Sequence, residues 1–423
     1  MAGADSVMAW WFPFASPIMG SLGPSVEERT GKGAGVPRPE GGKRAEGDTP
    51  AARGVPACPT PMNAPRRTPH ALRSPSKGDD MVRLDPMSLD PEPTVDREAL
   101  ESVFADHLSE AAVRAAALLS GGWSLALPDE SAHLDLPVFA DAADAGNWMA
   151  ANTEALVSCA RGARESRNHL TVCRIAESLE VHLRGTGRSS ELVELLRSAS
   201  ASARDLEDTA WEARTRNLLG LSLLETGELA GADREFETAL ALADTDEDDR
   251  GRATALEGRG IVAQRDRRDD EALALFERVR PLKEALKWTH GIAVLDLLAG
   301  RSLLNSGRFE HAMERLDAAM AVFDATGEDA VPDEVNAAKV RSERGRALIA
   351  ARRFVDAREE LYEAREGFEK HDQVSPSARV CELLAGLGQL NREDGWRRHL
   401  VEAERLYERI GDTAAVERVR RHL

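Results

Sequence analysis

Four stretches of this chain repeat one spacing of small and large apolar residues, and this repeat limits the possible fold more than any other feature. Each stretch has a glycine, an alanine 12 residues later, a phenylalanine or leucine after 16, and an alanine or valine after 19. The four sets are Gly220, Ala232, Phe236, Ala239; Gly260, Ala272, Phe276, Val279; Gly300, Ala312, Leu316, Ala319; and Gly345, Ala357, Leu361, Ala364. Their glycines lie 40, 40 and 45 residues apart, which is typical of consecutive copies of one structural unit.

The spacing inside each unit predicts two antiparallel helices joined by a short turn. The glycine in the first helix lets the second helix approach closely, and the large residue of the second helix fills the remaining gap. The last small residue leaves room for the next unit to stack. Turn residues fall between the two helices, as in Glu225-Thr226-Gly227 and Asn305-Ser306-Gly307. We therefore expect an all-α, right-handed solenoid of helical hairpins.

Composition agrees with a helical protein and disfavours two classes of partner. Ala, Leu, Glu and Arg are strong helix formers and dominate the chain, whereas aromatic residues make up only 4%. The 73 acidic and 55 basic residues give a formal charge of −18. This charge disfavours binding to nucleic acid or to an anionic membrane, because both need a basic surface.

The chain is expected to be cytoplasmic. Its four cysteines are scattered without a CxxC pair, which is typical of reduced thiols. The apolar stretch at 6–20 has no preceding basic residue and is interrupted by Pro13 and Pro17, so it predicts neither a signal peptide nor a membrane span.

Proline divides the sequence into regions. Fifteen of the twenty prolines lie at or before Pro93, so residues 1–93 are expected to be a disordered, Pro/Gly-rich segment. Residues 94–204 have helical periodicity and precede the repeats, with helices expected at Asn147–Arg161, Arg167–Leu183 and Ser190–Ala203 and a break at Gly162. Residues 205–423 form the predicted repeat array. Beyond Gly345 the frame degrades, and we expect an insertion before a last hairpin and a polar capping helix at Ala414–Leu423.

These spacings resemble the tetratricopeptide repeat family, in a variant with longer helices. A second resemblance begins upstream, where Asn147-Trp-Met-Ala-Ala-Asn-Thr-Glu-Ala-Leu-Val157 is similar to the helix that opens the repeat arm of actinobacterial NB-ARC regulators of the antibiotic-regulatory type. That resemblance spans roughly residues 97–412. It implies a regulatory protein that binds a partner through its repeats.

The chain departs from those regulators in two modules. It contains no GxxxxGK[ST] string to cradle nucleotide phosphates, and the stretch before residue 94 is too short for an ATPase domain. No helix-turn-helix or winged helix is visible at either end. The resemblance therefore implies the binding arm of such a regulator without its ATPase and DNA-binding modules.

Residues that flank the small residue of each first helix are expected to face the concave side of the array, where helical repeats bind ligands. Cationic side chains are frequent among them, which favours a protein or peptide partner that bears carboxylates. The predicted partner-binding groove contains Arg214, Asn217, Gln264, Arg265, Arg301, Asn305, Lys339, Ser342 and Arg346.

Catalytic chemistry has little support in the sequence. His169 and Cys173 share a helix face but lack further metal ligands nearby, and no GxSxG nucleophile elbow occurs. We therefore expect no metal, no cofactor and no catalysis. The leading hypothesis is a regulatory adaptor or scaffold. The alternatives are a truncated regulator without independent activity, a non-catalytic subunit of an enzyme complex, and an enzyme with its chemistry in residues 94–204.

The missing phosphate cradle generates one prediction. Titration of the purified chain with Mg²⁺ and ATP, followed by calorimetry, should give no heat of binding. A saturable signal would contradict the interpretation that the nucleotide-binding module is absent.

Overall fold

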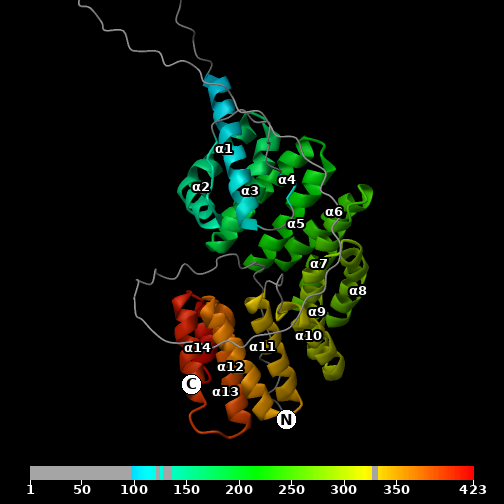
Figure 1. The fold of residues 1–423 in the computed structure, drawn as a ribbon, viewed down its shortest axis with the longest axis vertical. Coiled ribbons are helices and arrows are strands. Elements are labelled where there is room, and N and C mark those ends of the chain that lie inside the picture. Colours follow the sequence, from blue (N-terminus) through cyan, green and yellow to red (C-terminus); the bar gives the residue numbers. More distant parts are fainter. Residues whose placement is uncertain (1–96, 121–123, 127–135, 326–331) are drawn as a thin grey trace, which may run out of the picture. The chain divides into compact units, whose positions relative to one another are not determined.

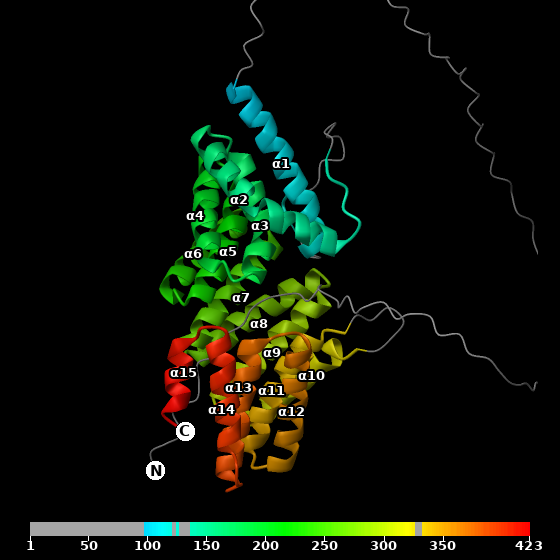
Figure 2. The ribbon, with the colours of Figure 1, turned by 90° about the vertical axis from the view of Figure 1, so that its left-hand side faces the viewer.

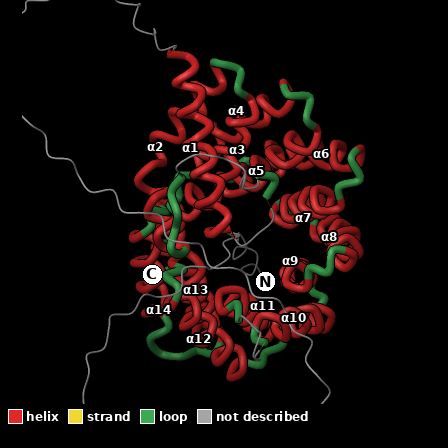
Figure 3. The backbone as a smooth tube through the Cα atoms, turned by 45° about the horizontal axis from the view of Figure 1, so that its top comes forward, coloured by secondary structure: helices red, strands yellow, loops and turns green. Residues whose placement is uncertain are grey.

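The computed structural model describes residues 97–120, 124–126, 136–325 and 332–423. Within these ranges it contains fifteen helices and no strand (Figures 1 and 3). The first eight helices are α1 Arg97–Ser120, α2 Ala142–Glu165, α3 His169–Gly185, α4 Ser189–Asp205, α5 Thr209–Thr226, α6 Leu229–Thr245, α7 Asp249–Arg265 and α8 Asp269–Ala285. The remaining ones are α9 Thr289–Asn305, α10 Phe309–Phe323, α11 Glu334–Ala350, α12 Phe354–Lys370, α13 Val374–Leu390, α14 Arg397–Arg409 and α15 Thr413–Arg420.

A regular turn explains the 40-residue length of most units. Helices of 17 residues, such as α7 and α8, are joined by three-residue turns. The middle turn residue adopts the left-handed backbone conformation, as in Arg267 with φ 63° and Gly307 with φ 73°. This conformation reverses the chain and lets a following amide reach a free carbonyl at the helix end, as in the 2.9 Å hydrogen bond from Arg268 N to Ala263 O.

The hairpins stack in chain order, so the colours of Figure 1 change progressively along the stack. Each odd-numbered helix from α3 to α11 contacts the next odd-numbered helix as well as its two sequence neighbours. Among the described helices from α4 onward, no two successive even-numbered helices contact each other to a similar extent. The odd-numbered helices therefore lie on the inner side of the curved stack, and we call them the inner row.

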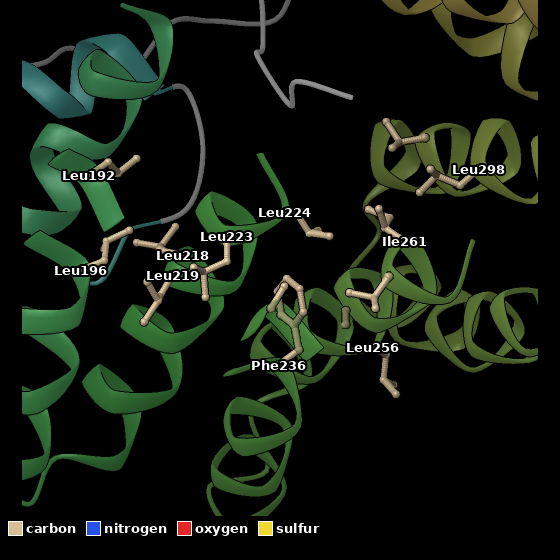
Figure 4. Packing of buried hydrophobic residues seen from close by; sticks show 14 of the residues in the cluster. Leu192, Leu196, Leu218, Leu219, Leu223, Leu224, Phe236, Leu256, Ile261 and Leu298 are labelled. Carbon is tan, nitrogen blue, oxygen red and sulfur yellow. The ribbon is translucent and has the colours of Figure 1, made fainter. Parts of the chain in front are cut away.

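Close approach between the helices depends on the repeated glycines. A Cβ atom on Gly220 of α5 would lie 2.7 Å from the Phe236 ring of α6, and one on Gly258 of α7 would lie 2.3 Å from the same ring. Figure 4 shows this ring between Leu223 and Leu256. Phe236 is fully buried, so its ring joins two successive hairpins.

The same contact recurs in the other three units. A Cβ atom on Gly260 would lie 2.3 Å from Phe276, and atoms on Gly300 and Gly345 would lie 2.9 and 2.7 Å from Leu316 and Leu361. The pairing of each glycine with the large residue 16 positions later is thus confirmed in all four units. A continuous buried cluster extends from Leu108 in α1 to Ala347 in α11.

These features confirm the predicted all-α solenoid of hairpins. Two details of the prediction are wrong. Gly162 does not break a helix: α2 continues through it to Glu165, because an exposed glycine inside a helix costs only about 1 kcal/mol.

The second error concerns the last hairpin. The helix α13 starts 40 residues after α11, without an insertion, and packs on α14. In α13, Ala385 takes the place of the repeat glycine, 40 residues after Gly345. The buried residues Leu400 and Ala403 of α14 follow Ala385 by 15 and 18 residues. The corresponding steps from Gly345 to Leu361 and Ala364 are 16 and 19 residues. One residue is therefore missing between α13 and α14, which lie side by side in Figure 2, and turns replace the first part of the second helix.

The expectation of disorder for residues 1–93 concerns residues outside the described part of the chain. The expected capping helix is α15, which is shorter than predicted and ends at Arg420. No helix in the described ranges is long and apolar enough to cross a bilayer.

Substituting alanine at two helical glycines should change stability in opposite directions. At Gly260 the new methyl group overlaps the buried Phe276 ring, and overpacking of this kind costs about 1–3 kcal/mol. At Gly162 the new Cβ would have no atom within 4 Å apart from the backbone of its own helix and its chain neighbours, so the alanine should stabilise the helix by up to about 1 kcal/mol. Thermal unfolding followed by circular dichroism measures both, and stabilisation of Gly260→Ala would contradict the packing argument.

Candidate functional site

A buried carboxylate links two cationic residues on the inner row. Arg301 of α9 donates from Nε to Glu343 Oε1 of α11 at 2.7 Å, and Arg346 of α11 donates from Nη1 to Glu343 Oε2. All three side chains are at most a tenth exposed. Burial alone would raise the pKa of Glu343, but the charges of the two guanidinium groups outweigh it and lower that pKa. Glu343 therefore stays ionised and fixes both arginines.

Asn305 extends this network toward the neighbouring unit. Its Oδ1 accepts from Arg346 Nη2 at 3.1 Å, and its Nδ2 donates to Asp269 Oδ1 at 2.9 Å. Asn305 ends α9 and Asp269 begins α8, so the network joins helices from three hairpins. Arg301, Asn305 and Arg346, which were predicted from sequence as groove residues, are thus brought together.

Lys339 lies on α11 beside this network. Its Nζ donates to Asn336 Oδ1 at 2.9 Å, and only 8% of the residue is exposed. Burial lowers the pKa of Lys339 to about 8, with the Asp333 charge acting in the opposite direction and the Arg301 charge in the same one.

Arg265 and Arg379 bring two more cations to the inner row from α7 and α13. Burial, followed by repulsion from Arg301 and Arg379, lowers the pKa of Arg265 to about 10. Burial also lowers the pKa of Arg379 to about 10, and Arg301 again contributes. The charge of Arg301 therefore acts on both arginines, although the three residues belong to three different hairpins.

We call these five residues of α7, α9, α11 and α13 the inner cation cluster: Arg265, Arg301, Lys339, Arg346 and Arg379. Both arginines lowered to about 10 remain charged at neutral pH. The cluster combines fixed positive charge with a local environment of low polarity, where a bond between a cation and a carboxylate is stronger than at an exposed surface.

The other predicted groove residues have different surroundings. Asn217 donates from Nδ2 to the carbonyl of Gly251 at 3.2 Å, and Gln264 donates from Nε2 to Leu298 O at 2.9 Å. Both of these amides thus join neighbouring inner helices. Arg214 pairs with Glu177 at 2.6 Å on an earlier part of the inner row, and Ser342 is half-buried on α11 next to Glu343.

Glu343 of this network and Arg379 of the inner cation cluster were not predicted from sequence. Glu343 lies three positions before Arg346, so the helical spacing of a carboxylate and a guanidinium group was an available signal. Arg379 lies in α13, beyond the point at which the repeat frame could be followed, and no local signal marks it.

The site offers electrostatic attraction and hydrogen bonds, and the described cysteines do not add a nucleophile. Burial raises the pKa of Cys173 to about 12 and those of Cys159 and Cys381 to about 11, so all three thiols are protonated at neutral pH. In the described parts of the chain, no group of three or more His, Cys, Asp or Glu side chains is arranged to hold a metal ion.

Comparison with known families agrees with the hairpin geometry. Residues 211–285 match the tetratricopeptide repeat family, and this range covers almost all of the two hairpins α5–α6 and α7–α8. None of the curated proteins matches the chain.

Several solved structures are similar in fold at low sequence identity. The apo form of RapI is 13% identical, covers 62% of this chain and 96% of its own, and has a TM-score of 0.50. The apo quorum sensor NprR from B. thuringiensis is 14% identical over 65% of this chain and 77% of its own, with a TM-score of 0.48. The TPR-like repeats of a kinesin light chain from Podosopora anserina are 18% identical over 48% and 97%, with a TM-score of 0.37. The family match places tetratricopeptide repeats at residues 211–285, and the similarity to RapI concerns the fold alone.

Removal of the Glu343 charge should destabilise the protein at neutral pH. The variant Glu343→Gln leaves Arg301 and Arg346 without the charge that they share, and losing one partner of a buried ion pair costs roughly 3–5 kcal/mol. The exposed Glu314 of α10 is a matched control, and Glu314→Gln should change stability by less than about 0.5 kcal/mol. Urea unfolding at pH 7 measures both variants.

The effect should also depend on pH with a defined sign. Because the pKa of Glu343 is lowered in the folded protein, its contribution is complete above the ordinary glutamate pKa of about 4.3 and is lost as the pH falls through the lower folded value. The difference between wild type and Glu343→Gln should therefore shrink below about pH 4. A difference that is constant from pH 7 to pH 3 would contradict the assignment.

Proposed function

We propose that this chain is a repeat scaffold that binds an extended segment of a protein partner on its inner row, without catalysis of its own. The tetratricopeptide repeat match over residues 211–285 supports a protein-binding scaffold. The finer proposal concerns where the partner binds and what chemistry it offers. It depends mainly on one observation, the inner cation cluster.

The cluster favours a partner segment with acidic side chains or a free carboxylate. Arg265, Arg301 and Arg379 repel one another, and a carboxylate between them would relieve this repulsion while accepting charge-assisted hydrogen bonds. Asn305 and Ser342 lie on the same two central helices, α9 and α11, and add neutral hydrogen-bonding groups. A peptide that runs along the inner row would meet these groups in successive units.

The negative charge of the whole chain would restrict where an acidic partner segment binds. The formal charge of −18 repels an acidic segment over most of the surface, so attraction at the inner cation cluster would direct that segment to one place. Binding of this kind should weaken as the salt concentration rises, because mobile ions screen the partly exposed groups.

A regulatory role in the cytoplasm is a further part of the proposal. Its support is the resemblance of residues 147–157, which lie in α2, to the helix that opens the repeat arm of NB-ARC regulators. A truncated regulator without independent activity, or a non-catalytic subunit of an enzyme complex, would share the same repeat array. Copurification of a separate ATPase with the tagged chain would favour the regulatory arm over both alternatives.

Selection from a random peptide library displayed on phage tests the binding proposal. The full chain should enrich peptides rich in Asp and Glu, and the selected peptides should bind with a Kd that rises with salt. The double variant Lys339→Gln, Arg379→Gln should lower their affinity at least tenfold, because it removes two cations from the cluster while leaving the Glu343 network intact.

The exposed Arg278 of α8 provides the control, because Arg278→Gln removes the same kind of charge from a helix outside the inner row. It should leave affinity unchanged. Equal loss in both sets of variants would point to the total charge and not to the cluster. Selection without acidic enrichment would remove the proposed partner chemistry.

A further inference from the structure

A short segment of the chain itself occupies an earlier part of the inner row. Residues Ser124–Ala126 follow α1 and contact α3 more than fifty residues farther along the sequence. The carboxylate of Glu177 accepts from Ser124 Oγ at 2.7 Å, from Leu125 N at 3.1 Å and from Ala126 N at 2.8 Å. One buried carboxylate therefore binds a side-chain hydroxyl and two successive backbone amides.

Glu177 lies on α3, one of the helices of the inner row. It precedes Asn217 of α5 by 40 residues and Glu257 of α7 by 80, so it holds the same register in its own unit. Arg214 of α5, one of the predicted groove residues, donates from Nε to Glu177 Oε1 at 2.6 Å and completes the site. The segment thus lies where the repeat geometry predicts a bound partner.

The segment also buries an apolar side chain, that of Ala126. Ala126 is only 6% exposed and packs in a small cluster with side chains from four helices. These residues are Val113 of α1, Cys173 of α3, Ala203 of α4 and Trp211 of α5, with Leu125 packed against them. Ala126 is buried among these side chains, and Glu177 binds two successive backbone N–H groups, which converge on one carboxylate because the chain bends at Leu125.

We propose that α3 and α5 form a binding site for a peptide with a bent backbone, and that Ser124–Ala126 is its tethered occupant. The site recognises two successive backbone N–H groups through Glu177, a hydroxyl on the first residue and a small apolar side chain on the third. It relies on the proposed function only in that the inner row is taken as the peptide-binding surface.

Because the tethered segment is short, it can leave the site and open it to a free peptide. Three ordered residues lose backbone entropy that offsets much of the gain from a few hydrogen bonds and one buried methyl group. The connection to α1 keeps the local concentration of the segment on the order of millimolar, so a free peptide of the same sequence competes poorly with it in the wild-type chain. Release of the segment should expose the site.

Hydrogen exchange measured by mass spectrometry tests the anchor. Leu125 and Ala126 amides should be protected in the wild-type chain, and Glu177→Gln should speed up their exchange at least tenfold. Glu194 is an exposed carboxylate on α4, and Glu194→Gln should leave the exchange unchanged. Equal exchange in wild type and Glu177→Gln would overturn the assignment of Glu177 as the anchor.

Binding in trans tests the site itself. The probe is a labelled synthetic peptide with the sequence of residues 121–130, Gly-Gly-Trp-Ser-Leu-Ala-Leu-Pro-Asp-Glu. In the full chain, Ala126→Asp places a charge in the apolar cluster and should release the segment, so that the peptide binds at least tenfold more tightly than to wild type. Adding Glu177→Gln to this variant should abolish the gain, and a scrambled peptide should not bind.

A helical circular dichroism spectrum establishes that each variant is folded. If Ala126→Asp loses helicity, the milder Ser124→Ala, which removes only the hydroxyl, takes its place with the same expected direction. No binding of the peptide to a folded, segment-released variant would overturn the proposal. This result is independent of the phage selection, since the segment contacts α1, α3, α4 and α5 whereas the inner cation cluster lies on α7 to α13.

Discussion

The structure depends on the contact between a glycine in each inner helix and the large apolar residue that faces it. At Gly220, Gly260, Gly300 and Gly345 a Cβ atom would overlap the side chain 16 residues later. The absent Cβ lets the two helices of a hairpin pack closely, and Phe236 also covers Gly258 of the following unit. The same contact therefore sets both the shape of one hairpin and its distance from the next, which is the property that a solenoid needs.

This close spacing has an electrostatic consequence for the inner row. Helices that curve toward each other bring side chains from different units together, so the cations Arg265 of α7, Arg301 of α9 and Arg379 of α13 repel one another. The buried carboxylate of Glu343 offsets part of this repulsion by binding Arg301, and it binds Arg346 of α11 as well. The charge of the inner row changes along its length. A carboxylate binds the chain's own segment near α3, and cations predominate near α11.

Much of the fold could be predicted from sequence because the repeat is a local signal. The internal spacing and the turn residues depend on a few tens of residues, and they located α5 to α12 closely. The prediction failed where one residue is missing between α13 and α14, since a single deletion shifts every later position by about 100° around a helix. It also failed at Gly162, because helix packing in α2 outweighs the low helical propensity of one residue.

The sequence by itself determined the all-α class and the hairpin unit, because both follow from periodicity within one unit, and it predicted a set of groove residues. It did not determine which of those residues work together. Asn217 and Gln264 hydrogen-bond to neighbouring inner helices, while Arg301, Asn305 and Arg346 join through Glu343. The approach of Arg379 to Arg301, and of Ser124–Ala126 to Glu177, joins residues more than fifty positions apart. Only the tertiary structure decided these contacts, because the curvature of the whole stack sets which units face each other.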